Sequence, residues 1–360
     1  MKLLHVLFPI LVFVTVQQVC AEGNDSPVSL GADLRYRHEL IDVEGKDARN
    51  RHRIRARVNM TANVQDNLSL GFQLGSGSDD PISTNQTLTG GFTSKQVNID
   101  LAYFTWKPAT VSGLSLSGGK VKNPFRIPAK TELLWDNDLN PEGLALRYSR
   151  SGGAVPFFVT ASYFWVEERK TEADAVLLGT QAGVDLTTAA AKIIAGAGYF
   201  DYQNTRRFAP FYDSGDSFGN SVDENGMYRY DYNDLEFFFE ATPQALPGSV
   251  TVFAEYVSNI AGDVNDNTGW MAGFSAGKCK NPGSFDASYY YKYLERDAVV
   301  GAFTASDFSD GGADGKGHVV NLNYQLASKT VLSATYYYNQ LSVDNGKNYH
   351  RLQLDMNFKL

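Results

Sequence analysis

Cysteine is scarce in this 360-residue chain, which carries only Cys20 and Cys279. Because Cys20 lies in an N-terminal segment that we expect to be removed, the mature chain would keep a single thiol. A single thiol excludes an internal disulfide and a metal cluster held by cysteines. The mature chain must therefore be held together by hydrogen bonds and packing.

Long hydrophobic runs are also scarce. One apolar run, Leu3 to Val16, follows Met1-Lys2 and precedes Val19-Cys20-Ala21. This order is typical of a secretory signal peptide cleaved after Ala21, and no later segment has the roughly 18 consecutive apolar residues of a membrane helix. We therefore predict a signal peptide over residues 1–21 and one exported domain over residues 22–360. Lipid attachment at Cys20 is the alternative, which the bulky side chain before it disfavours.

A basic excess and the usual catalytic arrangements are missing as well. The formal net charge of -8 argues against a nucleic-acid-binding protein. The acidic stretches 213–224 and 263–267 do not match the EF-hand spacing, so we predict no metal and no cofactor. The sequence has no His-x-x-x-His pair and no serine in a nucleophile elbow, so we predict no enzyme, with an outer-membrane lipase as the enzymatic alternative. The mature histidines are scattered: His38, His52, His318 and His350.

Strict alternation of polar and apolar residues is the main feature that is present. Between residues 51 and 64 the odd positions begin with Arg51, Arg53, Arg55 and Arg57, while the even positions after His52 are apolar. A period of two predicts a β-strand. Four arginines on one face cannot pack into a dry core, so that face must meet water. This stretch alone allows a surface strand of a soluble sandwich or a membrane strand with an aqueous lumen on one side.

The alternation recurs along the whole mature chain and favours the membrane strand. We count about sixteen strands, with short turns alternating with long polar loops and with Tyr, Phe or Trp at many strand ends. Aromatic strand ends are typical of strands that cross membrane interfaces. We therefore predict an all-β fold, a transmembrane antiparallel β-barrel with short periplasmic turns and long extracellular loops. Both termini would then lie on the periplasmic side.

One segment is ambiguous. Residues 175–200 include Ala189-Ala190-Ala191-Lys192-Ile193-Ile194, which also has helical character. We interpret the segment as two strands joined near residues 185–188, with a helix as the alternative.

Four stretches carry a family resemblance: Gly75 to Leu88, Asp100 to Trp106, Gly119 to Phe125 and Leu134 to Gly143. Together they resemble the proteobacterial "putative porin" family of outer-membrane channels. The resemblance implies a diffusion channel in the outer membrane of a Gram-negative bacterium. It also implies contact with outer-membrane lipid or lipopolysaccharide, and assembly as a homotrimer. One departure is the last residue, Leu360, because outer-membrane barrels usually end on an aromatic residue and Phe358 lies two positions earlier.

The loop between Lys120 and Gly143 follows the fifth predicted strand, where general porins fold a loop into the barrel. We predict that this loop constricts the pore, anchored by Leu133, Leu134 and Trp135, with its acidic residues facing lumen arginines. The alternative is an exposed loop and a wide arginine-lined wall. The candidate acidic residues are Asp136, Asp138 and Glu142, and the candidate basic lining is Arg35, Arg37, Arg51, Arg53, Arg55, Arg57, Lys120, Lys122 and Arg126.

The function that we predict is passive diffusion of small hydrophilic solutes and ions through this channel. Acid on one side and arginine on the other would create a transverse field that orients dipolar solutes and penalises apolar ones. The alternative is an adhesin or structural anchor that acts through the long outer loops 203–230 and 296–317.

Overall fold

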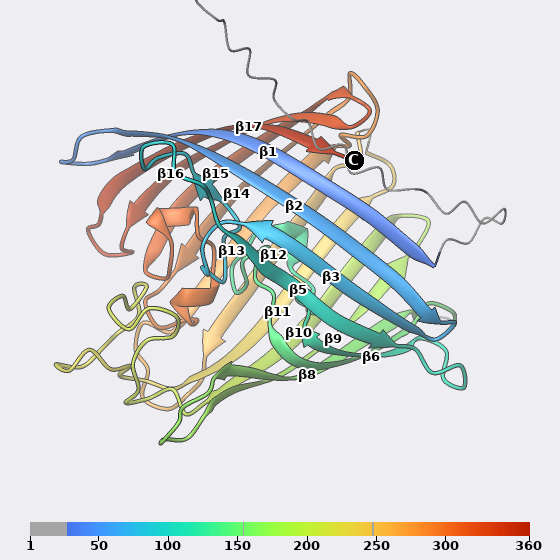
Figure 1. The fold of residues 1–360 in the computed structure, drawn as a ribbon, viewed down its shortest axis with the longest axis horizontal. Helices are drawn as coiled ribbons and strands as arrows, with labels where there is room; N and C mark the ends of the chain where they lie inside the picture. The colour runs from blue at the N-terminus through green and yellow to red at the C-terminus, as the bar shows by residue number, and fades with distance from the viewer. Residues whose placement is uncertain (1–26, 154, 247) are drawn as a thin grey trace, which may run out of the picture.

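The computed structural model describes residues 27–153, 155–246 and 248–360. The predicted signal peptide, residues 1–21, and Cys20 therefore lie outside the described residues. Within them, almost every regular element is a β-strand, and three short 3-10 helices lie in loops (Figure 1). No helix in this part of the chain has the length and apolar character needed to cross a membrane.

Sixteen long strands form one closed antiparallel barrel in the described chain. Each strand pairs with its neighbours in sequence, and β1 closes the barrel by pairing with β17. The prediction of a barrel with about sixteen strands is confirmed. The barrel strands are β1 (Val28–Val43), β2 (Arg49–Gln65), β3 (Leu68–Ser76), β5 (Val97–Trp106), β6 (Leu114–Lys120), β7 (Glu142–Arg150), β8 (Phe157–Glu167), β9 (Ala175–Thr187), β10 (Ala191–Gln203), β11 (Tyr232–Pro243), β12 (Thr251–Asn259), β13 (Thr268–Gly277), β14 (Phe285–Leu294), β15 (Gly315–Ala327), β16 (Thr330–Leu341) and β17 (Lys347–Lys359).

The remaining elements lie in the loops. The two-residue strand β4 (Gln86–Thr87) pairs with β2 where β3 has already ended. Helix η1 (Pro128–Lys130) lies in the loop after β6, and η2 (Gly301–Phe303) and η3 (Phe308–Asp310) lie in the loop after β14. These loops matter for function because they do not all extend outwards.

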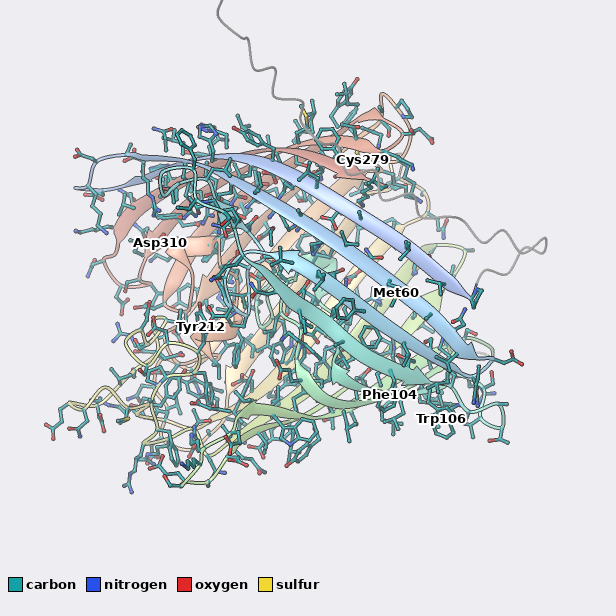
Figure 2. The ribbon with its side chains drawn as sticks, in the orientation of Figure 1. Met60, Phe104, Trp106, Tyr212, Cys279 and Asp310 are labelled. Atoms are coloured by element: carbon teal, nitrogen blue, oxygen red, sulfur yellow. The ribbon has the colours of Figure 1, made fainter. Side chains whose placement is uncertain are left out.

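The two-residue period of the sequence separates two environments. In β2 the arginines at odd positions turn into the barrel, while Val58 and Met60 at even positions are exposed on its outer surface. Met60 is labelled in Figure 2. A soluble protein would bury such side chains, but an apolar exterior is what a barrel needs in lipid. Sheet register requires this sorting, since a slip of one residue would turn every arginine outwards.

Aromatic side chains gather on the outer surface towards both ends of the barrel. Trp106 ends β5 beside the short turns, whereas Trp165 lies near the end of β8 and Trp270 near the start of β13, both beside the long loops. Three cross-strand pairs between a tyrosine hydroxyl and a histidine Nδ1, 2.8 to 2.9 Å apart, join β1 to β2, β14 to β15 and β16 to β17: Tyr36–His52, Tyr289–His318 and Tyr336–His350. Amphipathic rings of this kind suit the headgroup region of a membrane.

The ambiguous segment forms two strands, as predicted. β9 and β10 pair with each other from Lys192 opposite Thr187 to Gln203 opposite Val176. The turn lies at residues 188–190, slightly later than expected, and the helical alternative is wrong. Tertiary pairing overrides the helical propensity of the alanines, since β10 is bonded on both edges.

Candidate pore constriction

Seven arginines line one side of the lumen, and we call them the arginine wall. They come from three adjacent strands, β17, β1 and β2, in which Arg37 is directly opposite Arg53 and Arg35 opposite Arg55. The six arginines predicted from the sequence keep only 6% to 22% of their side-chain surface accessible. The wall is therefore packed against other groups and does not border a wide water-filled space. Its members are Arg35, Arg37, Arg51, Arg53, Arg55, Arg57 and Arg351.

Most of the counter-charge for this wall comes from the same three strands. Glu39 contacts Arg51, lies 3.7 Å from Arg53 and lies 2.8 Å from Arg351. Asp33 lies 2.9 Å from Arg57 and 3.2 Å from Arg55. Because guanidinium groups at such spacing repel one another, alternating carboxylates are needed to hold them together.

The loop 121–141 crosses the lumen. Near its start, the Arg126 amide donates to Gln181 Oε1 of β9 at 2.8 Å, and its guanidinium lies 3.3 Å from Glu240 of β11. Further along, Lys292 Nζ of β14 donates to the Glu132 carbonyl at 2.8 Å. Near its end, Asp138 lies 3.4 Å from Arg57 of β2. The loop therefore spans from one wall of the barrel to the opposite wall.

An aromatic core fixes this loop to the wall away from the arginines. Leu133, Leu134 and Trp135 are almost fully buried, as their predicted anchoring role requires. The ring of Phe200 lies edge-on to Phe125 at 4.8 Å and to Trp135 at 5.1 Å between centroids. Such ring pairs add to the stabilisation from apolar burial. The lumen thus has an aromatic-filled half and a charged half.

A second loop, residues 295–314, also folds inwards, which differs from the exposed outer loop expected at residues 296–317. Ala298 and Val299 are fully buried, and Thr304 Oγ1 donates to the Leu133 carbonyl at 2.8 Å. The physical reason is the apolar run from Ala298 to Phe303, whose exposure to water would be unfavourable. This apolar run is the feature of the sequence that indicates an inward-folded loop. The surrounding Gly and Asp residues instead suggested an exposed loop.

This second loop adds a carboxylate to the arginine wall. Asp307 lies 3.2 Å from Arg37 and 2.6 Å from Arg351. Burial by itself raises the pKa of Asp307, but the two guanidiniums outweigh burial and hold that pKa well below its ordinary value. Asp307 is therefore a permanent negative charge within the arginine wall.

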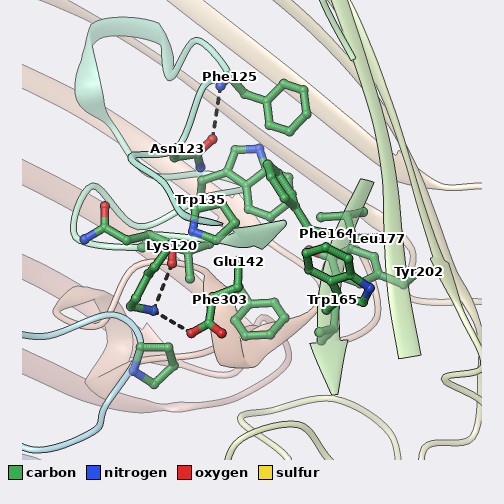
Figure 3. Close-up of a pocket in the computed structure, with 15 residues that line it drawn as sticks. Lys120, Asn123, Phe125, Trp135, Glu142, Phe164, Trp165, Leu177, Tyr202 and Phe303 are labelled. Carbon is green, nitrogen blue, oxygen red and sulfur yellow. Dashed lines mark hydrogen bonds and ion pairs between the residues drawn. The ribbon is translucent and has the colours of Figure 1, made fainter. Parts of the chain in front are cut away.

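The three predicted acidic residues have different surroundings. Asp138 reaches the arginine wall, 3.4 Å from Arg57 and 3.8 Å from Arg55. Asp136 points to the second inner loop, where its Oδ2 accepts a hydrogen bond from the Ser306 amide at 3.0 Å. Glu142 is exposed at the start of β7, 3.0 Å from Lys120, so it belongs to the rim and does not face the arginine wall (Figure 3).

Burial also changes the acidity of the loop 121–141. It raises the pKa of Glu132 to about 7 and holds the pKa of Asp136 well above its ordinary value, with the neighbouring carboxylates adding to the rise. The two groups have few cations near enough to compensate, since Lys292 is the one that lowers the pKa of Glu132. The loop is thus anchored partly through carboxyl groups that favour the protonated form.

The predicted basic residues outside the arginine wall are dispersed. Lys120 pairs with Glu142 at the rim, Arg126 pairs with Glu240 inside the barrel, and Lys122 is exposed. Five further charged residues of the constriction were not predicted from the sequence. Those that lie in strands have odd residue numbers, which the alternation assigns to the lumen side. The missed residues are Asp33, Glu39, Asp307, Arg351 and Asp355.

A third loop, residues 77–96, adds polar contacts to the wall. The Asn85 carbonyl accepts from Arg53 Nη2 at 3.3 Å, and its side chain accepts from Arg35. Among the described residues, no group of three or more histidine, cysteine, aspartate or glutamate side chains has a metal-binding arrangement.

Two kinds of comparison place this geometry among known proteins. A protein family described as "Putative porin" matches residues 16–218 and 248–360. No curated protein matches the chain in sequence.

Solved structures with the same fold are outer-membrane proteins and porins. OprB of Pseudomonas putida, in a high-pH structure, has a TM-score of 0.63 at 10% identity, with 93% of this chain and 94% of that chain covered. A triple mutant of the Rhodopseudomonas blastica porin has a TM-score of 0.51 at 13% identity, covering 92% of this chain and all of that chain. A loop-deletion mutant of OmpT, an outer membrane protein of Vibrio cholerae, has a TM-score of 0.51 at 16% identity, with 93% of this chain and all of that chain covered. At these identities the likeness concerns the fold.

Proposed function

We propose, on the premise that this chain belongs to the porin family described as "Putative porin", that it conducts small hydrophilic solutes and ions by passive diffusion across the outer membrane. The family and the barrel fold support the proposal of a non-enzymatic channel in the outer membrane. The closed wall, apolar outside and charged inside, supports this role because water can enter only the lumen.

The observation that carries the proposal is the close approach of Asp138 to the arginine wall. Its carboxylate, on a loop anchored to the opposite wall, lies 3.4 Å from Arg57 and 3.8 Å from Arg55. Because these groups are in direct contact, water cannot pass between them; they narrow the lumen on this side, and the field of their fixed charges acts on the water path beside them. A dipolar solute can align with that field, whereas an apolar solute must displace ordered water without replacing its interactions.

The charge balance supports a preference for anions. The seven arginines of the wall have five carboxylates within 4.0 Å, which leaves an excess of two positive charges among the ion-paired groups. Anions are therefore attracted to the constriction and cations are repelled. The five carboxylates are Asp33, Glu39, Asp138, Asp307 and Asp355.

Reversal potentials in a salt gradient across a planar bilayer test this function. Single channels should conduct, and the wild type should prefer chloride over potassium. The double variant Arg53→Glu with Arg55→Glu should shift the reversal potential towards cation preference. Lys192→Glu, which reverses a lumen-side charge far from the arginine wall in β10, is the control. An unchanged reversal potential in the double variant would remove the arginine wall from the ion path.

The orientation and assembly form part of the same proposal. The long loops face the cell exterior, the short turns, the start of β1 and the end of β17 face the periplasm, and the outer aromatic residues contact outer-membrane lipid and lipopolysaccharide. A homotrimer is supported by the strand number and layout shared with porins. Chemical crosslinking in native membranes should give a band of three chains, and a monomer alone would contradict the trimer.

The anchoring alternative is supported less well. Of its two long loops, residues 295–314 contribute a buried stretch inside the barrel, so they do not form a free outer surface. The loop 204–231 retains exposed acidic residues such as Asp213 and Asp216. Absence of single-channel current from correctly folded protein would favour the anchor.

A further inference from the structure

A second basic site lies inside the barrel, separate from the arginine wall. Two cavities occur beside β7, β8 and β9, below the loop 121–141. The smaller, of about 160 Å³, is lined by Arg126, Arg147, Phe158, Thr160 and Gln181 among others. The larger, of about 510 Å³, shares Arg126, Arg147 and Phe158 and extends to the short turns at Ser151 and Thr188. The shared residues make these two cavities one continuous lining on the short-turn side.

Arg147 is the central cation of this lining. It lies between the inward-facing residues Ala145 and Ser149 of β7, whereas Leu144 and Leu146 are exposed on the barrel exterior. Within the described part of the chain, no carboxylate lies within 4.0 Å of the Arg147 guanidinium, and the side chain has no hydrogen-bond partner there. Its donors are therefore available to a solute.

The neighbouring charges are already matched, which limits the charge of a suitable ligand. Arg126 lies 3.3 Å from Glu240, and Asp185, which lines the larger cavity, lies 3.4 Å from Lys192. Arg150 lines only the larger cavity and can attract anions from the short-turn side. The smaller cavity thus offers one uncompensated guanidinium, which suits a single negative charge better than a dianion.

An aromatic surface lies beside this cation. The rings of Phe158 and Phe238 stack at 6.5 Å between centroids, and both side chains are buried on the inner wall. Glycines allow the rings to lie flat, since a Cβ on Gly183 would be 2.6 Å from Phe158 and one on Gly196 would be 2.4 Å from Phe238. A planar apolar group can pack against such a surface while its charged end meets the guanidinium.

We propose that Arg147 and Phe158 form a binding site for small monocarboxylates with a planar apolar body, located between the constriction and the short turns. This proposal rests on the proposed channel function and specifies a solute class for it. The carboxylate accepts two parallel hydrogen bonds from the Arg147 guanidinium, a geometry that lysine cannot reproduce. The apolar body packs on Phe158, and the Thr160 and Gln181 side chains border it.

Block of single-channel current by benzoate tests the site. Benzoate added on the short-turn side in potassium chloride should reduce the wild-type current in a saturable way, while benzyl alcohol, which has no charge, should not. Arg147→Gln should weaken the apparent affinity for benzoate at least tenfold. Phe158→Leu should weaken block by benzoate several-fold and leave the weaker block by acetate unchanged.

Lys107→Gln is the control, because it also removes one positive charge on the short-turn side, where Lys107 is exposed and does not line either cavity. Its affinity for benzoate should equal that of the wild type. Equal losses in Arg147→Gln and Lys107→Gln would show a general charge effect and overturn the site. Conductance in potassium chloride without benzoate block would overturn the site alone, whereas absence of conductance would overturn the channel function as well. Resistance of each variant to unfolding in detergent confirms that it has folded.

Discussion

Arg37 and Asp355 form a two-point ion pair across the seam between the first and last strands, with Nε–Oδ1 and Nη2–Oδ2 distances of 2.7 Å each. The two residues are directly opposite each other in the β1–β17 register. Parallel hydrogen bonds of this kind are strong and directional. The arginine wall therefore contributes to the closure of the barrel, in addition to the electrostatic role that we propose for it in the lumen.

Loss of this pair should destabilise the barrel. In Asp355→Asn, Arg37 keeps Asp307 and Glu39 nearby but loses its two-point partner. Only 6% of the Arg37 side-chain surface and 7% of the Asp355 side-chain surface is accessible to solvent. Because the pair is buried, we expect its loss to lower the free energy of unfolding by about 3 kcal/mol. Urea unfolding in detergent, followed by intrinsic fluorescence, measures it. Asp185→Asn, which breaks the exposed pair with Lys192, should cost less than about 1 kcal/mol; equal costs would contradict a special role for the seam.

Removal of the Asp138 charge should change the pore more than the fold. Asp138→Asn eliminates the only carboxylate that the loop 121–141 presents to Arg55 and Arg57 among the described residues. We expect a severalfold rise in the chloride-to-potassium permeability ratio, because the positive excess at the constriction increases. Reversal potentials provide the measurement. Glu142→Gln, at the exposed rim, should leave the ratio close to that of the wild type, and the same rise in both variants would argue against a constriction at Asp138.

The stability of the loop 121–141 should depend on pH through Glu132. Burial raises the pKa of Glu132 from 4.5 to about 7 in the folded protein. Between these values the folded chain holds the proton more tightly than the unfolded chain, so stability should fall as the pH rises from 4.5 through 7. Asp136, whose pKa is raised as well, acts in the same direction, while Asp307 with its lowered pKa acts only at lower pH.

Thermal unfolding of Glu132→Gln in detergent at pH 5 and pH 8 tests this sign. Glutamine keeps an oxygen for the hydrogen bonds from Asn137 but cannot ionise. The variant should lose part of the wild-type difference between the two pH values, up to about 3 kcal/mol. A variant with the full wild-type difference would show that another group controls it.

Asn220 should hold the second inner loop in place. Its Nδ2 donates to the carbonyls of Arg296 and Val299 at 2.7 and 2.8 Å, and its Oδ1 accepts from the Gly301 amide at 2.8 Å. Asn220→Ala leaves these buried backbone groups unpaired, which costs about 1 kcal/mol or more for each group. Hydrogen exchange within residues 297–305 should accelerate at least tenfold. Asn225→Ala, at an exposed turn of the same loop 204–231, should leave the exchange unchanged; acceleration in both variants would contradict this role.

Strand positions were predictable from the sequence because their signal is local. The alternation around Arg53 and Arg55 assigned these side chains to the watery face, and the barrel has them there. The same parity placed Asp33 and Glu39 on that face, so the main counter-ions of the wall could have been found in the same way. From the sequence we predict the counter-charge on the acidic loop 121–141 instead, whereas most of it comes from these strand residues.

The inward fold of the loop after Lys120 was predicted, but the contacts of its individual side chains were not predictable, since they depend on residues far apart in the chain. Asp136 and Asp138 are two positions apart, yet one bonds to Ser306 and the other to Arg57. Nothing local in the sequence separates them. The direction of each carboxylate follows from the aromatic anchor of the loop and from its contact with residues 295–314, and both exist only when the barrel has closed.

The sequence by itself determined the barrel, its strand number, and which residues face lipid or lumen, because a two-residue period is a property of each strand alone. The tertiary structure decided how much of the lumen is filled, which acid meets which arginine, and that Arg147, beside Phe158, has no ion-pair partner among the described residues. These features arise where the inner loops contact side chains of several strands at once. Such contacts form only when the strands have closed into a barrel.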